Sequence, residues 1–148
     1  MDVVTGDTPF IALIDDDGHS AHLLTRMLLA HGAPDVKHFN LPTAAEAFLT
    51  VTLADARVEW PGLVIVDLKA HSAANLEFAL RNQALLRQKG VPLAVMTQPT
   101  DRAGRQVLHD AGASAVFFRQ ADLDAYRHEV ASIVSFWARS QRLDAVGM

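Results

Sequence analysis

The sequence is short of several residue types, and each shortage excludes a class of function. It contains no cysteine, which excludes disulfides, thiolate metal sites and a cysteine nucleophile. Lysine occurs only at Lys37, Lys69 and Lys89, and 13 Lys and Arg face 17 Asp and Glu for a net charge of −4. That balance argues against nonspecific nucleic-acid binding, because neutralising phosphates requires clustered basic residues.

Long hydrophobic runs are also absent from the sequence. No apolar stretch approaches the roughly 20 residues that a membrane-spanning helix needs. The first residues include Asp2 and Asp7 and lack the basic-then-apolar order of a signal peptide. We therefore expect a cytoplasmic protein that binds neither membrane nor nucleic acid.

The composition suits one globular domain. Half of the 148 residues are hydrophobic, which is enough for a single core. We expect residues 1–8 to be a mobile N-terminal segment, residues 9–141 to form the domain, and residues 142–148 to form a C-terminal tail.

Short apolar runs alternate with longer segments of helical periodicity. The runs predict strands over residues 10–14, 36–39, 63–66, 91–96 and 115–118. The periodic segments predict a helix that ends near Gly32, one that begins at Pro42, and three more over 74–87, 101–110 and 123–137. Strands that alternate with helices of this length are typical of parallel sheets with right-handed crossovers. The predicted fold is therefore an α/β, doubly wound, five-stranded parallel sheet flanked by helices, of the flavodoxin-like type.

Polar residues follow several of the predicted strands directly. Asp15, Asp16 and Asp17 follow the first strand and Asp67 follows the third. Thr97 and Arg119 follow the fourth and fifth. The carboxyl ends of parallel strands share one edge of the sheet, where ligands of such folds gather. Because clustered carboxylates repel one another, this set predicts a site for a hard divalent cation such as Mg²⁺.

These residues, in this order, resemble the receiver domain of two-component response regulators. The resemblance runs from Phe10 to about Trp137. It is carried by the acid pair of Ile14-Asp15-Asp16, by Asp67 in Val64-Ile65-Val66-Asp67-Leu68, by Thr97 after Ala94-Val95-Met96, and by the turn Ala111-Gly112-Ala113. It implies the receiver fold and a stand-alone response regulator rather than an enzyme.

The resemblance also implies a role for each strand-end residue. Asp67 would accept a phosphoryl group from a histidine kinase, a phosphotransfer protein or a small phosphodonor. Asp16 would bind Mg²⁺ directly, with Asp67, the backbone carbonyl of Lys69 and a supporting Asp15. Thr97 would hydrogen-bond a phosphoryl oxygen. Output would pass to a partner protein through the face formed by the fourth helix, fifth strand and fifth helix, and a homodimer is also compatible.

The sequence departs from the family pattern around this site. Arg119-Gln120 stands where the family has Lys-Pro; arginine keeps the positive charge but presents it as a planar fork. Gln98 replaces a small residue, and Val116 stands at the aromatic switch position. Lys69, two residues after the phosphoacceptor, has two readings: its ammonium supplies charge to the site, or it is a solvated loop residue.

Two other functions remain open from the sequence. The domain could be a receiver-like binding module whose state does not depend on phosphorylation of Asp67. Less strongly supported is a haloacid-dehalogenase-type phosphohydrolase, with Asp15 as nucleophile, Asp17 as general acid and Thr97 in its second motif. Asp17 fits better as the N-cap of the first helix. The cognate kinase, pathway and output partner are not encoded in any motif.

Overall fold

The computed structural model describes residues 9–146, with side chains up to residue 141. The predicted mobile segment 1–8 therefore lies outside the described residues. At the other end, the last helix continues to Val146, where the sequence led us to expect a tail from residue 142. No helix in the described part of the chain is long and apolar enough to cross a membrane.

Strands and helices alternate along the whole described chain. Their order is β1 (Ile11–Asp15), α1 (Gly18–Ala30), β2 (Val36–Phe39), α2 (Pro42–Thr52), β3 (Leu63–Asp67), α3 (Ala74–Lys89), β4 (Leu93–Thr97), α4 (Arg102–Asp110), β5 (Ala115–Phe118) and α5 (Leu123–Val146). Every predicted element is present, and most boundaries agree within two residues. The largest difference is the greater length of α5, which continues beyond the apolar stripe that predicted it.

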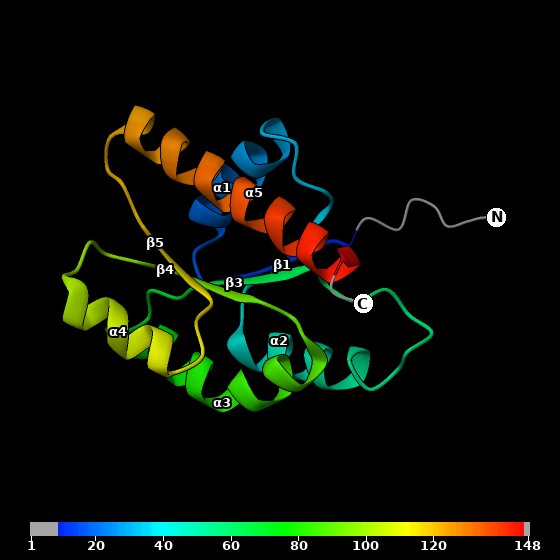
Figure 1. The fold of residues 1–148 in the computed structure, drawn as a ribbon. Coiled ribbons are helices and arrows are strands. Elements are labelled where there is room, and N and C mark those ends of the chain that lie inside the picture. The colour runs from blue at the N-terminus through cyan, green and yellow to red at the C-terminus, as the bar shows by residue number, and fades with distance from the viewer. Residues whose placement is uncertain (1–8, 147–148) are drawn as a thin grey trace.

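The five strands form one parallel sheet with the order β2-β1-β3-β4-β5 (Figure 1). The order reverses between β1 and β3, because β2 pairs on the far side of β1. Asp15 and Asp67 are register partners at the ends of β1 and β3. The predicted doubly wound fold is confirmed, and its switch point lies at two of the acids that the sequence singled out.

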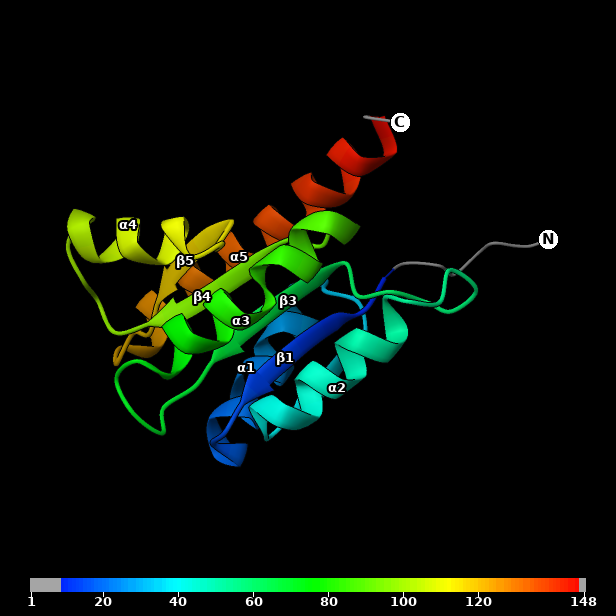
Figure 2. The same ribbon diagram turned by 90° about the horizontal axis from the view of Figure 1, so that it is seen from below.

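Helices cover both faces of the sheet. Helices α1 and α5 pack on one face, while α2, α3 and α4 pack on the other (Figures 1 and 2). All residues of β1 and β3 are buried, as expected of strands covered on both sides. Alternate residues of these strands feed two separate hydrophobic clusters: Ile11, Leu13 and Ile65 face α1 and α5, and Ala12, Ile14 and Val64 face the other helices.

Candidate functional site

Two carboxylates lie side by side at the switch point of the sheet. Asp15 is fully buried and Asp67 is 1% exposed. Each is the last residue of its strand, so each is held by the ladder of backbone hydrogen bonds that aligns β1 with β3. Two buried like charges at this spacing require positive charge nearby.

Lys69 supplies part of that charge. Its Nζ lies 2.8 Å from Oδ1 of Asp15 and 3.1 Å from Oδ2 of Asp67. It also donates to the backbone carbonyl of Asp67 at 3.0 Å. The side chain is only 26% exposed, so the reading of Lys69 as a charge donor to the site is confirmed and the solvated-loop reading is wrong.

Arg119, which follows β5, supplies the second cation. Its Nε donates to Oδ1 of Asp67 at 2.6 Å, and its Nη2 donates to the carbonyl of Leu68 at 3.1 Å. The backbone N–H of Arg119 donates to the carbonyl of Thr97 at 2.8 Å, which aligns the ends of β4 and β5. The guanidinium thus joins the Asp67 side chain to the backbone of the β3–α3 loop through two different nitrogens of one rigid plane.

Burial and charge act in opposite directions on Asp67. Burial raises the pKa of the Asp67 carboxyl above its ordinary value, and the positive charges of Lys69 and Arg119 partly offset this rise. The same environment reaches Tyr126 on α5, which lines a neighbouring cavity with Asp67 and Arg119. Burial, reinforced by the negative charge of Asp67, raises the pKa of the Tyr126 hydroxyl to about 12.

The other two acids of the Asp-Asp-Asp run bind backbone amides. The carboxylate of Asp16 accepts hydrogen bonds from the N–H of Lys69 at 2.9 and 3.1 Å and from the N–H of Ala70 at 2.9 Å. Asp17 caps α1 by accepting from the N–H groups of His19 and Ser20. The N-cap prediction for Asp17 is confirmed, and the carboxylate of Asp16 is engaged with the β3–α3 loop, away from its predicted role as a direct metal ligand.

This arrangement does not fit the divalent cation that the sequence led us to expect. No group of three or more His, Asp or Glu side chains among the described residues is placed to hold a metal ion. One buried oxygen, Oδ2 of Asp15, has no hydrogen-bond partner in the described part of the chain. A single carboxylate oxygen is not a magnesium site, and the ammonium of Lys69 stands against the adjacent oxygens of Asp15 and Asp67.

A cavity of about 570 Å³ opens beside the two cations. It is lined by residues of the loops after β3, β4 and β5: Leu68, Lys69, His71, Ser72, Asn75, Thr97, Gln98, Pro99, Thr100 and Arg119. Thr97 and Gln98 are therefore both at its wall, as their position after β4 predicted. The volume exceeds that of one phosphoryl group.

Asn75 is a structural member of the site whose role the sequence analysis did not predict. Its Oδ1 accepts from the N–H of Leu68 at 2.7 Å, and its Nδ2 donates to the carbonyl of Met96 at 2.9 Å. The buried amide thereby joins the ends of β3 and β4. Its spacing after Asp67 and its place at the start of a helix were visible in the sequence, but only the packing of α3 aims the side chain at both strands.

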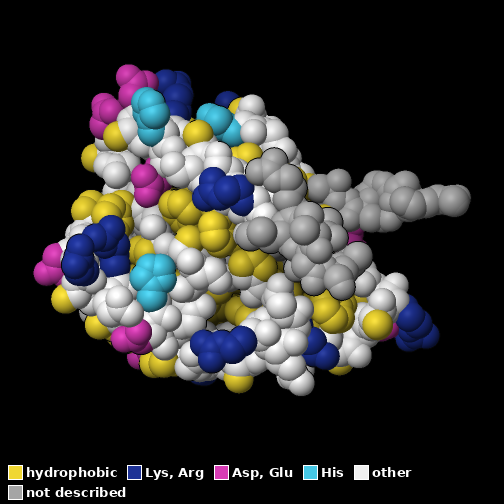
Figure 3. All heavy atoms as spheres, in the orientation of Figure 1, with side chains coloured by type: hydrophobic (Ala, Val, Ile, Leu, Met, Phe, Trp, Pro, Cys, Tyr) yellow, Lys and Arg dark blue, Asp and Glu magenta, His cyan; other side chains and the backbone are white. Residues whose placement is uncertain are grey.

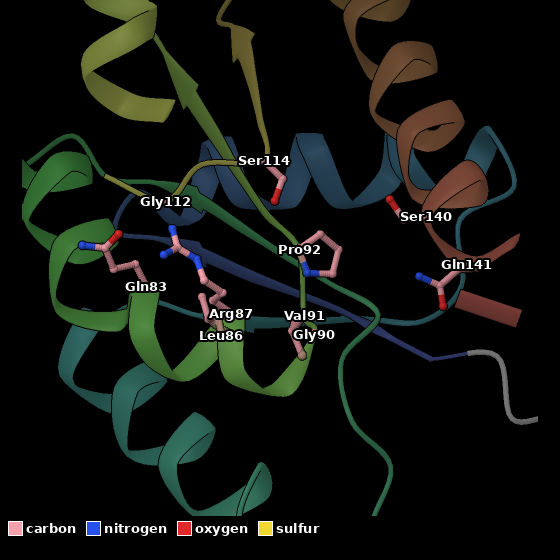
Figure 4. A pocket seen from close by; sticks show the side chains of 10 residues that line it. All are labelled: Gln83, Leu86, Arg87, Gly90, Val91, Pro92, Gly112, Ser114, Ser140 and Gln141. Carbon is pink, nitrogen blue, oxygen red and sulfur yellow. The ribbon is translucent and has the colours of Figure 1, made fainter. Parts of the chain in front are cut away.

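A second large cavity lies away from the acids. Its volume is about 390 Å³, and it is bordered by the end of α3, the segment before β4 and residues Ser140 and Gln141 of α5 (Figure 4). Among the described residues that line it, Arg87 alone is ionisable. The acidic strand-end site and this cavity occupy opposite ends of the strands, and of the two, as far as side chains up to residue 141 are concerned, the acidic site carries the clustered charge.

The phosphohydrolase alternative is not supported by this geometry. It requires Asp17 to act as a general acid, but that carboxylate is bound to the first turn of α1. It also requires Asp15 to attack a substrate, but Asp15 lines neither of the two cavities beside the site, whereas Asp67 lines one of them. The hypothesis left Asp67 without a role, whereas the structure places Asp67 at the centre of the site.

Neither a protein-family model nor a curated protein matches the sequence, but solved structures match the fold. The chain is similar to a phosphorylated cyanobacterial phytochrome response regulator, RcpA, with 20% identity, a TM-score of 0.71, and coverage of 88% of this chain and 94% of that one. It is also similar to the Mn²⁺-bound response regulator Rcp1, with 21% identity, a TM-score of 0.67, and coverage of 87% and 94%.

A receiver domain from Rhodospirillum rubrum gives a similar result, with 19% identity, a TM-score of 0.67, and coverage of 87% of this chain and 93% of that one. At this level of identity, the agreement concerns the path of the chain. The described chain, with its β2-β1-β3-β4-β5 sheet and its paired acids at the switch point, has the fold of response regulator receiver domains.

Proposed function

We propose that this protein is a response regulator receiver that accepts a phosphoryl group on Asp67 and signals by contact with other proteins. The observation that carries the proposal is the position of Asp67. Its carboxylate stands at the switch point between two cations, Lys69 and Arg119, which also line the 570 Å³ cavity with Thr97. An anionic donor entering that cavity meets positive charge first.

The proposed reaction is an exchange of one bond for another at phosphorus. A carboxylate oxygen of Asp67 bonds to the phosphorus, and the bond from phosphorus to the donor atom breaks. The bonding pair leaves with the donor, which takes a proton from solvent. The two cations offset the charge of nucleophile and phosphoryl group. Oδ1 must exchange its bond to Arg119, or Oδ2 its pair with Lys69, for the bond to phosphorus.

The proposed output surface is formed by α4, β5 and α5. Strand β5 is the edge strand between these two helices and faces the viewer in Figure 1. On the same face hydrophobic side chains gather along the middle, with Lys and Arg side chains around them (Figure 3). Val107 of α4 and Leu123 of α5 are each about half exposed. Such a surface suits a protein partner, which we propose to be an output protein, with a histidine kinase or phosphotransfer protein as phosphodonor.

A second function is favoured by one specific observation. Both carboxylate oxygens of Asp67 are already paired with cations, and the residue is almost fully buried. Neither oxygen of Asp67 can therefore attack a phosphoryl group unless an ion pair is first broken. The alternative is a receiver-like binding module that contacts its partner without phosphorylation of Asp67.

Intact-mass measurement after treatment with a small phosphodonor separates the two functions. We expect the wild-type mass to increase by one phosphoryl group. The adduct should be absent in Asp67→Asn and retained in Asp15→Asn, which is the matched control because it removes the neighbouring carboxylate. Absence of any adduct in folded wild type, with and without Mg²⁺, would contradict phosphorylation of Asp67 and favour the binding module instead. An adduct at Asp15 would contradict both.

The Arg119→Lys variant tests how the second cation contributes. It keeps the charge but loses the guanidinium bonds to Asp67 and Leu68. We expect it to alter the rate of adduct formation, measured as mass against time. An unchanged rate would show that charge alone is required at this position.

A further inference from the structure

The ammonium of Lys69 stands where a shared cation would be needed. It is within 3.1 Å of one oxygen from each of the two buried carboxylates. A cation that bridges Asp15 and Asp67 must lie between those oxygens. Lys69 already lies there, and it is tethered by its own backbone two residues beyond Asp67 and by its bond to the carbonyl of that residue.

The third acid is withdrawn from the same space. Asp16 accepts three hydrogen bonds from the backbone N–H groups of Lys69 and Ala70. These bonds hold the β3–α3 loop against the end of β1. These hydrogen bonds therefore occupy the carboxylate of Asp16, which could otherwise bind a metal. They also hold the backbone of Lys69, whose ammonium lies between Asp15 and Asp67.

We infer that Lys69 replaces the divalent cation in this protein. The intact pocket then excludes Mg²⁺ and Mn²⁺, and phosphoryl transfer to Asp67 proceeds without a divalent metal. A second cation placed beside the ammonium would be repelled at close range in a poorly solvated site. The part of the inference that concerns phosphoryl transfer rests on the proposed function, whereas the exclusion of metal stands without it.

The reverse consequence is that removal of Lys69 should create a metal site. Without the ammonium, both oxygens of Asp15 and Oδ2 of Asp67 lack a cationic partner. Such ions keep several of their waters and need few protein ligands, and Asp15 and Asp67 would then offer two neighbouring carboxylates. The gain of binding is a sharper test than a loss, because a merely damaged protein does not acquire a metal site.

Mn²⁺ binding measured from the electron paramagnetic resonance signal of the free ion tests the inference. We expect wild type to leave the free-ion signal unchanged. We expect Lys69→Ala to bind one Mn²⁺ at least about tenfold more tightly than wild type does. Tenfold in affinity corresponds to about 1.4 kcal/mol of relieved charge repulsion. Lys89→Ala, which removes a lysine elsewhere, should behave like wild type. Adding Asp15→Asn to Lys69→Ala should abolish the gain.

Equal binding by wild type and folded Lys69→Ala would overturn the inference, as would no binding by either. If Lys69→Ala does not fold, Lys69→Asn is used in its place. Wild-type protein alone can also overturn the inference: it is wrong if wild type binds one Mn²⁺ and Asp15→Asn loses that binding. The phosphodonor experiment repeated with a chelator separates the two proposals. An adduct that requires Mg²⁺ overturns the inference and supports the proposed function, whereas no adduct under any condition contradicts only the proposed function.

Discussion

The four acids at the carboxyl edge of the sheet divide into two pairs with different chemistry. Asp15 and Asp67 are buried and are paired with the side chains of Lys69 and Arg119. Asp16 and Asp17 lie nearer the surface and are bound to backbone N–H groups. A run of adjacent acids therefore does not form a single cluster. Successive side chains point to different sides of the chain. Asp15 therefore contacts an ammonium, whereas Asp16 and Asp17 contact backbone N–H groups.

The two pairs should differ in how much stability is lost when one of their contacts is removed. A buried carboxylate that loses its cation keeps an uncompensated charge in a poorly solvated place. An amide-bound carboxylate at the surface that is removed leaves N–H groups that water can reach. The buried pair should therefore dominate the stability of the site.

The largest effect is expected from Lys69→Met, which keeps bulk but removes the ammonium. Asp15 and Asp67 then lose their shared partner, and we expect the free energy of unfolding to fall by about 3 kcal/mol. Urea denaturation measures it. Lys89→Met is the control, expected to cost about 0.5 kcal/mol through its contact with the Trp60 ring. The double variant Lys69→Met/Asp15→Asn should recover part of the loss; a double variant no more stable than Lys69→Met would contradict the shared-cation arrangement.

A smaller loss is expected from Asp16→Ala. The N–H groups of Lys69 and Ala70 lose a charged acceptor, and we expect about 2 kcal/mol of destabilisation. Asp16→Asn retains one acceptor oxygen and should lose less. Hydrogen exchange of these two amides should accelerate in Asp16→Ala. Unchanged exchange would show that Asp16 does not hold the loop.

Asp17→Ala should cost about 1 kcal/mol, the usual value for loss of a helix N-cap. The effect arises because the N–H groups of His19 and Ser20 lose their side-chain acceptor. Asp17→Ser restores an acceptor and should regain most of the stability in thermal denaturation. Neither variant should change the yield of phosphoryl adduct. A lost adduct in Asp17→Ala would mean that this acid belongs with the buried pair.

The smallest expected effect is a shift in the pKa of Tyr126, which measures the influence of the Asp67 charge on that hydroxyl. Tyr126 is the only tyrosine in the chain, so phenolate absorbance during alkaline titration reports it alone. We expect a midpoint near the raised pKa of about 12. In Asp67→Asn the midpoint should move down toward 10, because the carboxylate charge that helps raise the pKa is gone. An unmoved midpoint would show that the charge of Asp67 does not contribute to the raised pKa of Tyr126, which would then come from burial and from Asp15.

The raised pKa of Tyr126 also sets the direction of an effect on stability. Between pH 10 and about 12 the unfolded chain has released the hydroxyl proton while the folded chain still holds it. The folded state binds more protons, so stability must fall as pH rises through this interval. Tyr126→Phe lacks this contribution and should show a shallower decline of the melting temperature above pH 10. An equal slope for both proteins would contradict the assignment.

Much of the site could be predicted from the sequence, since it follows from strand periodicity. The apolar runs before Asp15, Asp67 and Thr97 predicted where each strand would end, and the parallel fold predicted that these ends would share one edge. The N-cap role of Asp17 followed from its place before a helical pattern. These inferences depend on neighbours in the chain, and local sequence records them.

Other features were not predictable, because they depend on contacts between distant segments. Lys69 reaches a carboxylate 54 positions earlier in the chain. From the sequence, Lys69 could equally have been a solvated loop residue or a source of charge for the site. Nothing in the sequence predicted the hydrogen bond from Asn75 to the carbonyl of Met96. The magnesium expectation treated the acids as one set, whereas Asp16 is directed to the backbone of a loop that only the packed sheet brings near.

The sequence by itself determined the alternation of strands and helices, the acidic edge of the sheet and the basic residue after β5, because hydrophobic periodicity and strand length govern all three. Tertiary structure decided which acid faces which partner. Side-chain direction and loop packing place the ammonium of Lys69 between Asp15 and Asp67 and direct Asp16 away from them. In a buried site that choice of partner governs the chemistry, since the free energy of a carboxylate there depends on the charge next to it.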